Sequence, residues 1–221
     1  TMYPAHIKLA SVYMNKGDYD TAILHCRKAL DINNQNAEAH YMLGRIYTVR
    51  KQTDNAISSF QKAIQLDPKF FAARAEIAEI YTQRGMRDKA ISEYKSAIAL
   101  DPKNAYNYQR LGSLYEQQNN IAEAISAYRK AIQLAPNKAV LAYNNLACIY
   151  AQQNKNLDEA MTLAEKAKEL SPTNGEVLDT LGLVYYLKQM YDQAINSFES
   201  AKLALPNNPT VRYHLGMAYY K

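Results

Sequence analysis

A residue pattern that returns about every 34 positions is the feature that most constrains the fold of this chain. It is clearest in the stretch from Tyr108 to Pro136, which predicts two short amphipathic helices joined by a turn at Asn119 and Asn120. Small and large apolar residues recur there at spacings of three and four: Tyr108, Leu111, Gly112 and Tyr115, then Ala124, Tyr128 and Ala131. One such pair of helices cannot bury its own apolar face. We therefore expect the chain to be stable only as a stack of neighbouring repeats.

The pattern predicts an all-α fold of six full repeats plus the first helix of a seventh, arranged as a single array that is a fragment of a longer chain. The predicted repeats span residues 3–36, 37–70, 71–104, 105–138, 140–174 and 175–208, with a partial repeat at 209–221. The fifth repeat is irregular, because Ala139 must be an extra residue and the turn at residues 154–157 must be one residue longer. Ala164 stands where neighbouring repeats carry Phe or Tyr. This predicts either a closer approach of helices or a shallow pocket.

Charge and cysteine content exclude several classes of function. The net charge is +5, with no block of like charges and no basic stripe interleaved with aromatic residues, so we expect no nucleic-acid partner. No apolar run approaches the roughly 18 residues of a membrane-spanning helix. Cys26 and Cys148 are far apart in a linear stack, which argues against a disulfide, and Cys26 is expected to be a small buried thiol. The compartment stays open between cytoplasm and bacterial periplasm.

The residues that usually carry catalysis or metal binding do not form a recognisable pattern. None of the four histidines is paired with a metal-ligating residue at a helical spacing, and the seven glycines form no phosphate-binding loop. We therefore expect no catalytic, cofactor or metal site, and the chain is predicted not to be an enzyme. Glu76 and Glu79 lie near each other on one predicted helix face. We interpret them as an acidic patch flanked by Arg45 and Arg110 rather than as an acid–base pair.

The repeat residues resemble those of the tetratricopeptide repeat (TPR) family. The second repeat shows the full set in the order Leu43, Gly44, Tyr47, Ala56, Phe60, Ala63 and Pro68. The resemblance covers almost the whole chain. It implies a right-handed superhelix of helical hairpins, a TPR solenoid, whose concave groove is lined by the first helix of each repeat and binds a peptide or a partner helix.

Carried over position by position, the resemblance implies a set of groove residues that bind the partner. They are Tyr41, Arg45, Glu76, Glu79, Gln109, Arg110, Asn144, Asn145, Asp179, Tyr186, Tyr213 and Met217. Cys148 and His214 occupy groove positions as well. The resemblance thus predicts a non-enzymatic scaffold for protein–protein interaction. The alternative is a regulatory or substrate-presenting arm of a larger enzyme whose catalytic domain lies outside this segment.

Two further expectations concern the second half of the chain. Residues 143–172, 177–195 and 207–221 resemble, more loosely, bacterial TPR proteins of envelope and exopolysaccharide-export systems, which implies a place in such an assembly. The end of the chain is apolar and aromatic, with Leu187, Tyr213 and Tyr220 among its residues. Either it forms a pocket for a partner helix or it packs against further repeats. In the second case the isolated segment should self-associate through this end.

Overall fold

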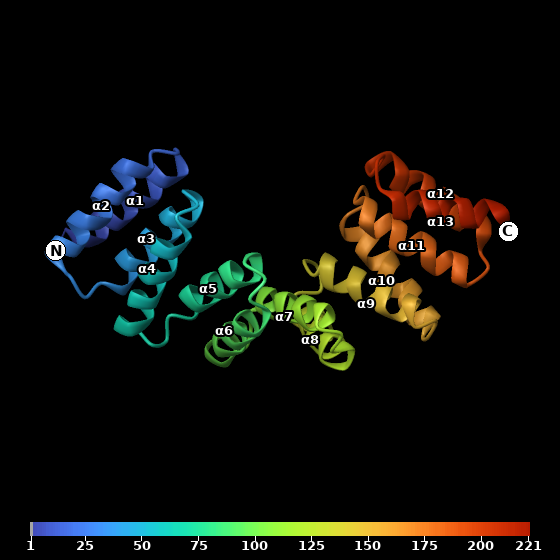
Figure 1. Ribbon diagram of the computed structural model, residues 1–221, viewed down its shortest axis with the longest axis horizontal. Helices are drawn as coiled ribbons and strands as arrows, with labels where there is room; N and C mark the ends of the chain where they lie inside the picture. Colours follow the sequence, from blue (N-terminus) through green and yellow to red (C-terminus); the bar gives the residue numbers. More distant parts are fainter. Residues whose placement is uncertain (1) are drawn as a thin grey trace. The chain divides into compact units, whose positions relative to one another are not determined.

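The computed structural model describes residues 2–221, and the contacts of the chain divide it into two compact units. Unit 1 ends at Pro102, and unit 2 runs from Lys103 to Lys221. The helices of unit 1 are α1 (Tyr3–Asn15), α2 (Tyr19–Ile32), α3 (Ala37–Val49), α4 (Thr53–Leu66), α5 (Phe71–Gln83) and α6 (Arg87–Leu100). Those of unit 2 are α7 (Ala105–Gln117), α8 (Ile121–Leu134), α9 (Val140–Gln152), α10 (Leu157–Leu170), α11 (Gly175–Leu187), α12 (Tyr191–Ala204) and α13 (Pro209–Tyr220). The prediction of thirteen helices is confirmed over the described residues (Figure 1).

Each hairpin packs an aromatic or small residue of its second helix onto a small residue of its first helix. In unit 1, a Cβ added to Gly44 would lie 2.5 Å from the ring of Phe60. In unit 2, a Cβ added to Gly182 would lie 2.6 Å from the ring of Phe198. Both rings are fully buried. Glycine at these two positions therefore allows the close approach of the ring, whereas other repeats carry alanine at the same position, as at Ala78.

The turns inside the hairpins share one backbone conformation. Each contains a residue with positive φ at the same place in the repeat: Gly17, Lys51, Gly85, Asn119, Asn154 and Gln189. Asparagine and aspartate then cap several helices. Asp18, for example, accepts a hydrogen bond from the backbone N–H of Thr21 at 3.1 Å, and Asn36 accepts one from Ala39 at 2.8 Å. Short polar turns thus stop one helix and start the next without long loops.

The irregular fifth repeat has the two insertions that the sequence predicts. Five residues, 135–139, separate α8 from α9, whereas four separate the other neighbouring hairpins. Four residues, 153–156, separate α9 from α10, whereas three separate the two helices of every other hairpin. Asn156 adds a second residue with positive φ to that longer turn. Ala164 is fully buried in a cluster with Ala147 and Leu181, so neighbouring side chains fill the space. The burial of Ala164 favours the alternative in which the helices approach closely.

Neighbouring hairpins are tied by ion pairs whose partners are 30 residues apart. In unit 1, Arg50 contacts Asp20 and Arg84 contacts Asp54, each at 2.7 Å. In unit 2, Lys188 contacts Asp158. The tyrosines of the following first helix add hydrogen bonds, as where Tyr185 donates to Glu165 at 3.2 Å. These exposed pairs are individually weak, on the order of 0.2–1 kcal/mol, so they set the register of the stack more than its stability.

Cys26 is fully buried, as expected, and burial raises the pKa of its thiol to about 12. Both Cys26 and Cys148 are free thiols.

Candidate functional site

In unit 1, the predicted groove residues of α3 and α5 lie against one another. The hydroxyl of Tyr41 donates to the carboxylate of Glu76 at 3.4 Å, and the guanidinium of Arg45 lies 6.0 Å from the centre of the Tyr41 ring. Glu79 accepts a hydrogen bond from Tyr94 at 2.8 Å. We call Tyr41, Arg45, Glu76 and Glu79 the unit 1 strip.

The charged side chains of the unit 1 strip partly compensate one another. Burial raises the pKa of Glu76, and the nearby carboxylate of Glu79 raises it further. The positive charge of Arg45 and the hydrogen bond from Tyr41 act in the opposite direction. Burial also raises the pKa of Tyr41, and Arg45 again opposes the shift. The strip therefore contains its own cation beside its buried acid.

In unit 2, a hydrogen-bonded chain connects the first helices α7 and α9 through a tyrosine of α8. The hydroxyl of Tyr128 donates to Glu116 at 2.8 Å, and it accepts from the side-chain amide of Asn145 at 2.9 Å. Tyr128 is fully buried, and burial is the main cause that raises its pKa. A buried hydroxyl with both a donor and an acceptor in place holds its neighbours in fixed positions.

Asn144 and Cys148 continue this surface along α9. Asn144 is only 9% exposed, and its Oδ1 atom has no hydrogen-bond partner among the described residues. Its side-chain nitrogen contacts Oδ1 of Asn145 at 3.5 Å. Cys148 follows one helical turn later, and Gln152 lies 3.3 Å from its sulfur. Burial raises the pKa of the Cys148 thiol to about 11, and the carboxylates of Glu116 and Asp179 contribute to the rise.

The next pair of first helices is joined by Asp179 of α11 and His214 of α13. A carboxylate oxygen of Asp179 lies 2.9 Å from Nδ1 of His214, and both side chains are mostly buried. The ring of His214 also packs against Phe198, with 5.4 Å between centroids. We call the whole set the unit 2 strip. Its members are Glu116, Tyr128, Asn144, Asn145, Cys148, Asp179 and His214.

The other predicted residues also lie on first helices. Gln109, Arg110 and Met217 are half-buried. Tyr186 packs edge-on against Tyr191, with 5.7 Å between centroids, and Tyr213 is 68% exposed. Their role in binding stays a prediction.

Two features of the site do not follow from the repeat pattern. Tyr128 occupies a packing position of the repeat, but its counterparts Phe60 and Phe198 lack a hydroxyl. Tyrosine at a fully buried aromatic position signals a buried polar partner, and Tyr94 and Tyr128 each donate to a glutamate of their own hairpin. Spacing within a single helix relates none of the histidines to another metal-ligating residue. The fold brings His6 and His25 together between helices, with their Nδ1 atoms 2.9 Å apart.

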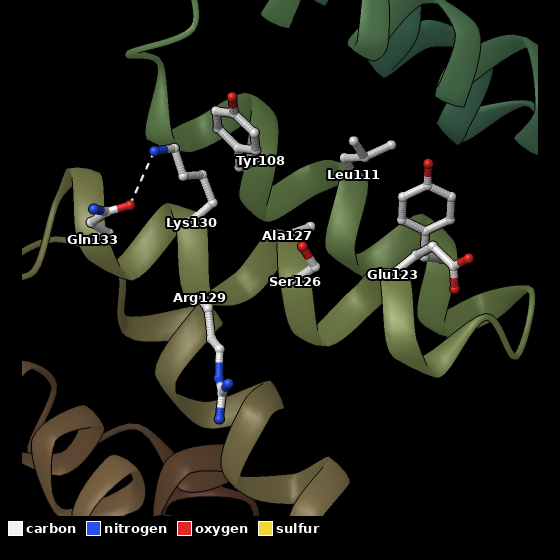
Figure 2. A pocket seen from close by; sticks show the side chains of 9 residues that line it. Tyr108, Leu111, Glu123, Ser126, Ala127, Arg129, Lys130 and Gln133 are labelled. Atoms are coloured by element: carbon white, nitrogen blue, oxygen red, sulfur yellow. Dashed lines mark hydrogen bonds between the residues drawn. The ribbon is translucent and has the colours of Figure 1, made fainter.

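A depression of about 660 Å³ lies elsewhere on unit 2, over α7 and α8 (Figure 2). It was not predicted. Its lining residues are Tyr108, Leu111, Tyr115, Glu123, Ser126, Ala127, Arg129, Lys130 and Gln133. Figure 2 shows that Lys130 is hydrogen bonded to Gln133, at 3.0 Å, and that Arg129 points away from Tyr108. The arginine instead contacts Tyr150 and Glu159 in the following repeat. The polar groups of Lys130, Gln133 and Arg129 thus already have partners within the chain, and we assign the depression no function.

Residues 2–221 hold no cluster of three or more His, Cys, Asp or Glu side chains placed to bind a metal ion. Within the same residues, no helix combines the length and the apolar character needed to cross a membrane.

Comparisons with known proteins define the family to which this chain belongs. A family model described as the TPR domain of cytochrome c-type biogenesis protein H matches residues 94–212, more than half of the chain. Two other models, described as tetratricopeptide repeat and TPR repeat, match residues 49–114 and 10–48. The chain belongs to the TPR family, and the predicted all-α repeat fold is confirmed. No curated protein matches the chain in sequence.

Solved structures with the same fold include three proteins of low sequence identity. PilF of Pseudomonas aeruginosa has a TM-score of 0.86 and 18% identity, over 97% of this chain and 97% of PilF. PilW, a type IV pilus biogenesis factor, has a TM-score of 0.76 and 18% identity, over 97% of this chain and 99% of PilW. YrrB, a TPR protein with an unusual peptide-binding site, has a TM-score of 0.71 and 19% identity, over 85% and 96%.

Proposed function

We propose that this chain is a non-enzymatic scaffold that binds a peptide or a partner helix on the surface formed by the first helices of its repeats. One observation carries the proposal. Polar side chains of consecutive first helices are half-buried and connected by hydrogen bonds, as Glu116 of α7 and Asn145 of α9 are through the buried hydroxyl of Tyr128 in α8. Groups fixed in this way lose little conformational entropy when they bind a partner, which favours recognition of an extended segment.

The residues that we propose for partner contact fall on both units. Unit 1 contributes Tyr41, Arg45, Glu76 and Glu79, and unit 2 contributes Gln109, Arg110, Asn144, Asn145, Asp179, Tyr186, Tyr213 and Met217. Carboxylates, amides and aromatic rings alternate in this set. Such a mixed surface suits a polar or charged peptide, because complementary charges give specificity and orientation more than raw affinity.

We also propose a role in an envelope or export assembly of a bacterium. The support is the resemblance of residues 143–172 and 177–195 to TPR proteins of such systems. The family model for residues 94–212 is named after a cytochrome c-type biogenesis protein, and PilW is a pilus biogenesis factor. Both names belong to proteins that help to build other structures, which fits a scaffold that presents a partner during assembly.

Self-association through the C-terminal end is a separate proposal about partners. Tyr213, Tyr219 and Tyr220 are 68%, 58% and 88% exposed on α13, and Leu203 of α12 is 85% exposed. Exposed aromatic residues that gather at one end favour association with an apolar surface. Analytical ultracentrifugation should show a dimer that Tyr213→Ser and Tyr220→Ser together disperse. A monomer at every concentration would refute this proposal.

Affinity capture from a bacterial lysate tests the scaffold function. The bait is the chain itself, and the control carries Arg45→Glu, Arg110→Glu and Asn145→Ala, with circular dichroism to confirm that it remains helical. A partner retained by the first and lost by the second supports binding on the first helices. Equal capture by both would contradict it.

A further inference from the structure

Two imidazole rings from different helices meet in the first hairpin of unit 1. His6 lies on α1 and His25 lies on α2, the two helices that form this hairpin (Figure 1). Their Nδ1 atoms are 2.9 Å apart, and their ring centroids are 5.2 Å apart. Both side chains are half-buried, so the pair lies at the surface rather than inside the core. Two nitrogen donors from separate helices thus converge on one point.

The packing of the hairpin holds the two rings in this arrangement. Ile7, the neighbour of His6 in the chain, is only 4% exposed. Cys26, the neighbour of His25, is fully buried. The ring of Tyr13 stacks on the ring of His25, with 5.5 Å between centroids and 11° between the ring planes. Ligands that are already in place lose little conformational entropy when they bind, which favours a site at this point.

The short distance between the two Nδ1 atoms defines how they share a proton. A hydrogen bond between them needs a proton on one nitrogen and a lone pair on the other. A neutral imidazole carries its single proton on either of its two nitrogens. The proton between the rings can therefore be exchanged for one on the Nε2 atom of the same ring. Both Nδ1 atoms then present lone pairs, and the number of protons on the chain is unchanged.

The distance also matches two neighbouring ligands of one metal ion. Imidazole nitrogens bind transition metals at about 2.0–2.1 Å, so two of them at a right angle are about 2.8–3.0 Å apart. A tetrahedral angle would place the two nitrogens about 3.3–3.4 Å apart. Right angles between nitrogen ligands are typical of the square-planar or tetragonal coordination of Cu²⁺ and Ni²⁺, whereas Zn²⁺ favours the tetrahedron.

We propose that His6 and His25 form a binding site for a divalent transition-metal ion of tetragonal preference, Ni²⁺ or Cu²⁺, which the two Nδ1 atoms coordinate at adjacent positions. Residues 2–221 place no third His, Cys, Asp or Glu beside the pair, so water fills the remaining positions on the ion. The inference is independent of the proposed scaffold function, because neither histidine belongs to the unit 1 strip.

Isothermal titration calorimetry of the full chain, without an affinity tag, tests the site. The probe is NiCl₂ at pH 7.5, since the free thiols of Cys26 and Cys148 can reduce Cu²⁺. ZnCl₂ and MgCl₂ represent ions that prefer tetrahedral coordination and oxygen ligands. The variants are His6→Gln and His25→Gln. The matched control is His40→Gln, which removes a half-buried histidine of α3.

Two further measurements locate the ion and check the fold. NMR spectra recorded with Ni²⁺ show where it binds, because a paramagnetic ion broadens the signals of nearby residues. Circular dichroism confirms that each variant remains helical. If one variant loses its helices, the other is sufficient, since removal of either ring leaves a single imidazole.

One Ni²⁺ ion should bind per chain, more tightly than Zn²⁺, and Mg²⁺ should not bind. His6→Gln and His25→Gln should each weaken Ni²⁺ binding by about tenfold or more, because two linked ligands act at a high effective concentration. His40→Gln should leave the Kd unchanged. Ni²⁺ should broaden the signals of residues around His6 and His25 and spare those around His40.

Two results would overturn the inference as a whole. If Ni²⁺ does not bind the unmodified chain, or if neither variant weakens its binding, the two rings share a hydrogen bond only. Tighter binding of Zn²⁺ than of Ni²⁺, lost in both variants, would overturn the tetragonal geometry and thereby the class of ion. None of these results bears on peptide binding by the first helices.

Discussion

The two strips use similar residues in opposite ways. In unit 1, Arg45 lies beside Tyr41 and Glu76 and opposes the pKa shift of both groups. In unit 2, Glu116 and Asp179 reinforce each other at Cys148, and their hydrogen-bonding partners are a tyrosine and a histidine. In unit 1 a cation thus lies beside the acids, whereas in unit 2 two acids raise the pKa of the same thiol. The repeat fixes where the first helices lie, and a few side chains decide what each strip attracts.

The largest expected effect comes from truncating the buried aromatic ring of each unit. Phe60→Ala and Tyr128→Ala should each destabilise the chain by about 3–5 kcal/mol, because both rings are fully buried. Tyr128→Ala should cost about 1 kcal/mol more, since it also leaves Glu116 and Asn145 without their shared partner. Chemical denaturation with local hydrogen exchange measures both. Equal losses for the two variants would show that the hydroxyl of Tyr128 contributes nothing.

A reciprocal exchange of the hydroxyl isolates its contribution from that of the ring. Tyr128→Phe should destabilise by about 1–2 kcal/mol, because the ring stays and two hydrogen bonds are lost. Phe60→Tyr should also destabilise, since it buries a hydroxyl in a hairpin whose first helix carries no glutamate at the positions of Glu79 or Glu116. The readout is the denaturation midpoint of each variant. If Tyr128→Phe leaves the denaturation midpoint unchanged, the hydrogen bonds of the Tyr128 hydroxyl do not stabilise unit 2.

A smaller effect distinguishes the buried acid of unit 1. The folded-state pKa of Glu76 is raised, so folding favours its protonated form, and this carboxyl lowers stability as the pH rises above the ordinary range of a glutamate. Glu76→Gln should therefore stabilise the chain at pH 7, by less than about 1 kcal/mol. The gain should vanish in acid, where Glu76 is protonated in both states. Thermal melts across pH measure the difference, and a loss of stability at neutral pH would mean that attraction to Arg45 outweighs burial.

Much of the fold was predictable from the sequence because small and large packing residues recur at the same positions in each repeat. The spacing of residues such as Gly44 and Phe60 defines where two helices touch, and the two insertions in the fifth repeat follow from the shift in that spacing. The contacts of the candidate site could not be predicted in the same way. Whether Tyr128 meets Glu116 depends on side-chain rotamers and on three helices at once. The proximity of His6 and His25 likewise depends on two helices that no spacing within one helix can relate.

The ionisation of Cys148 tests the central claim, that negative charge accumulates on the unit 2 strip, most directly. The measurement is the pH dependence of thiol alkylation in a Cys26→Ala background, with folding monitored by circular dichroism. Cys148 should ionise with a midpoint near 11. Glu116→Gln and Asp179→Asn together should lower that midpoint and speed alkylation at pH 8, whereas Glu176→Gln should leave both unchanged. A midpoint near the ordinary cysteine value of about 8.5, or one that the double variant does not move, would contradict the account.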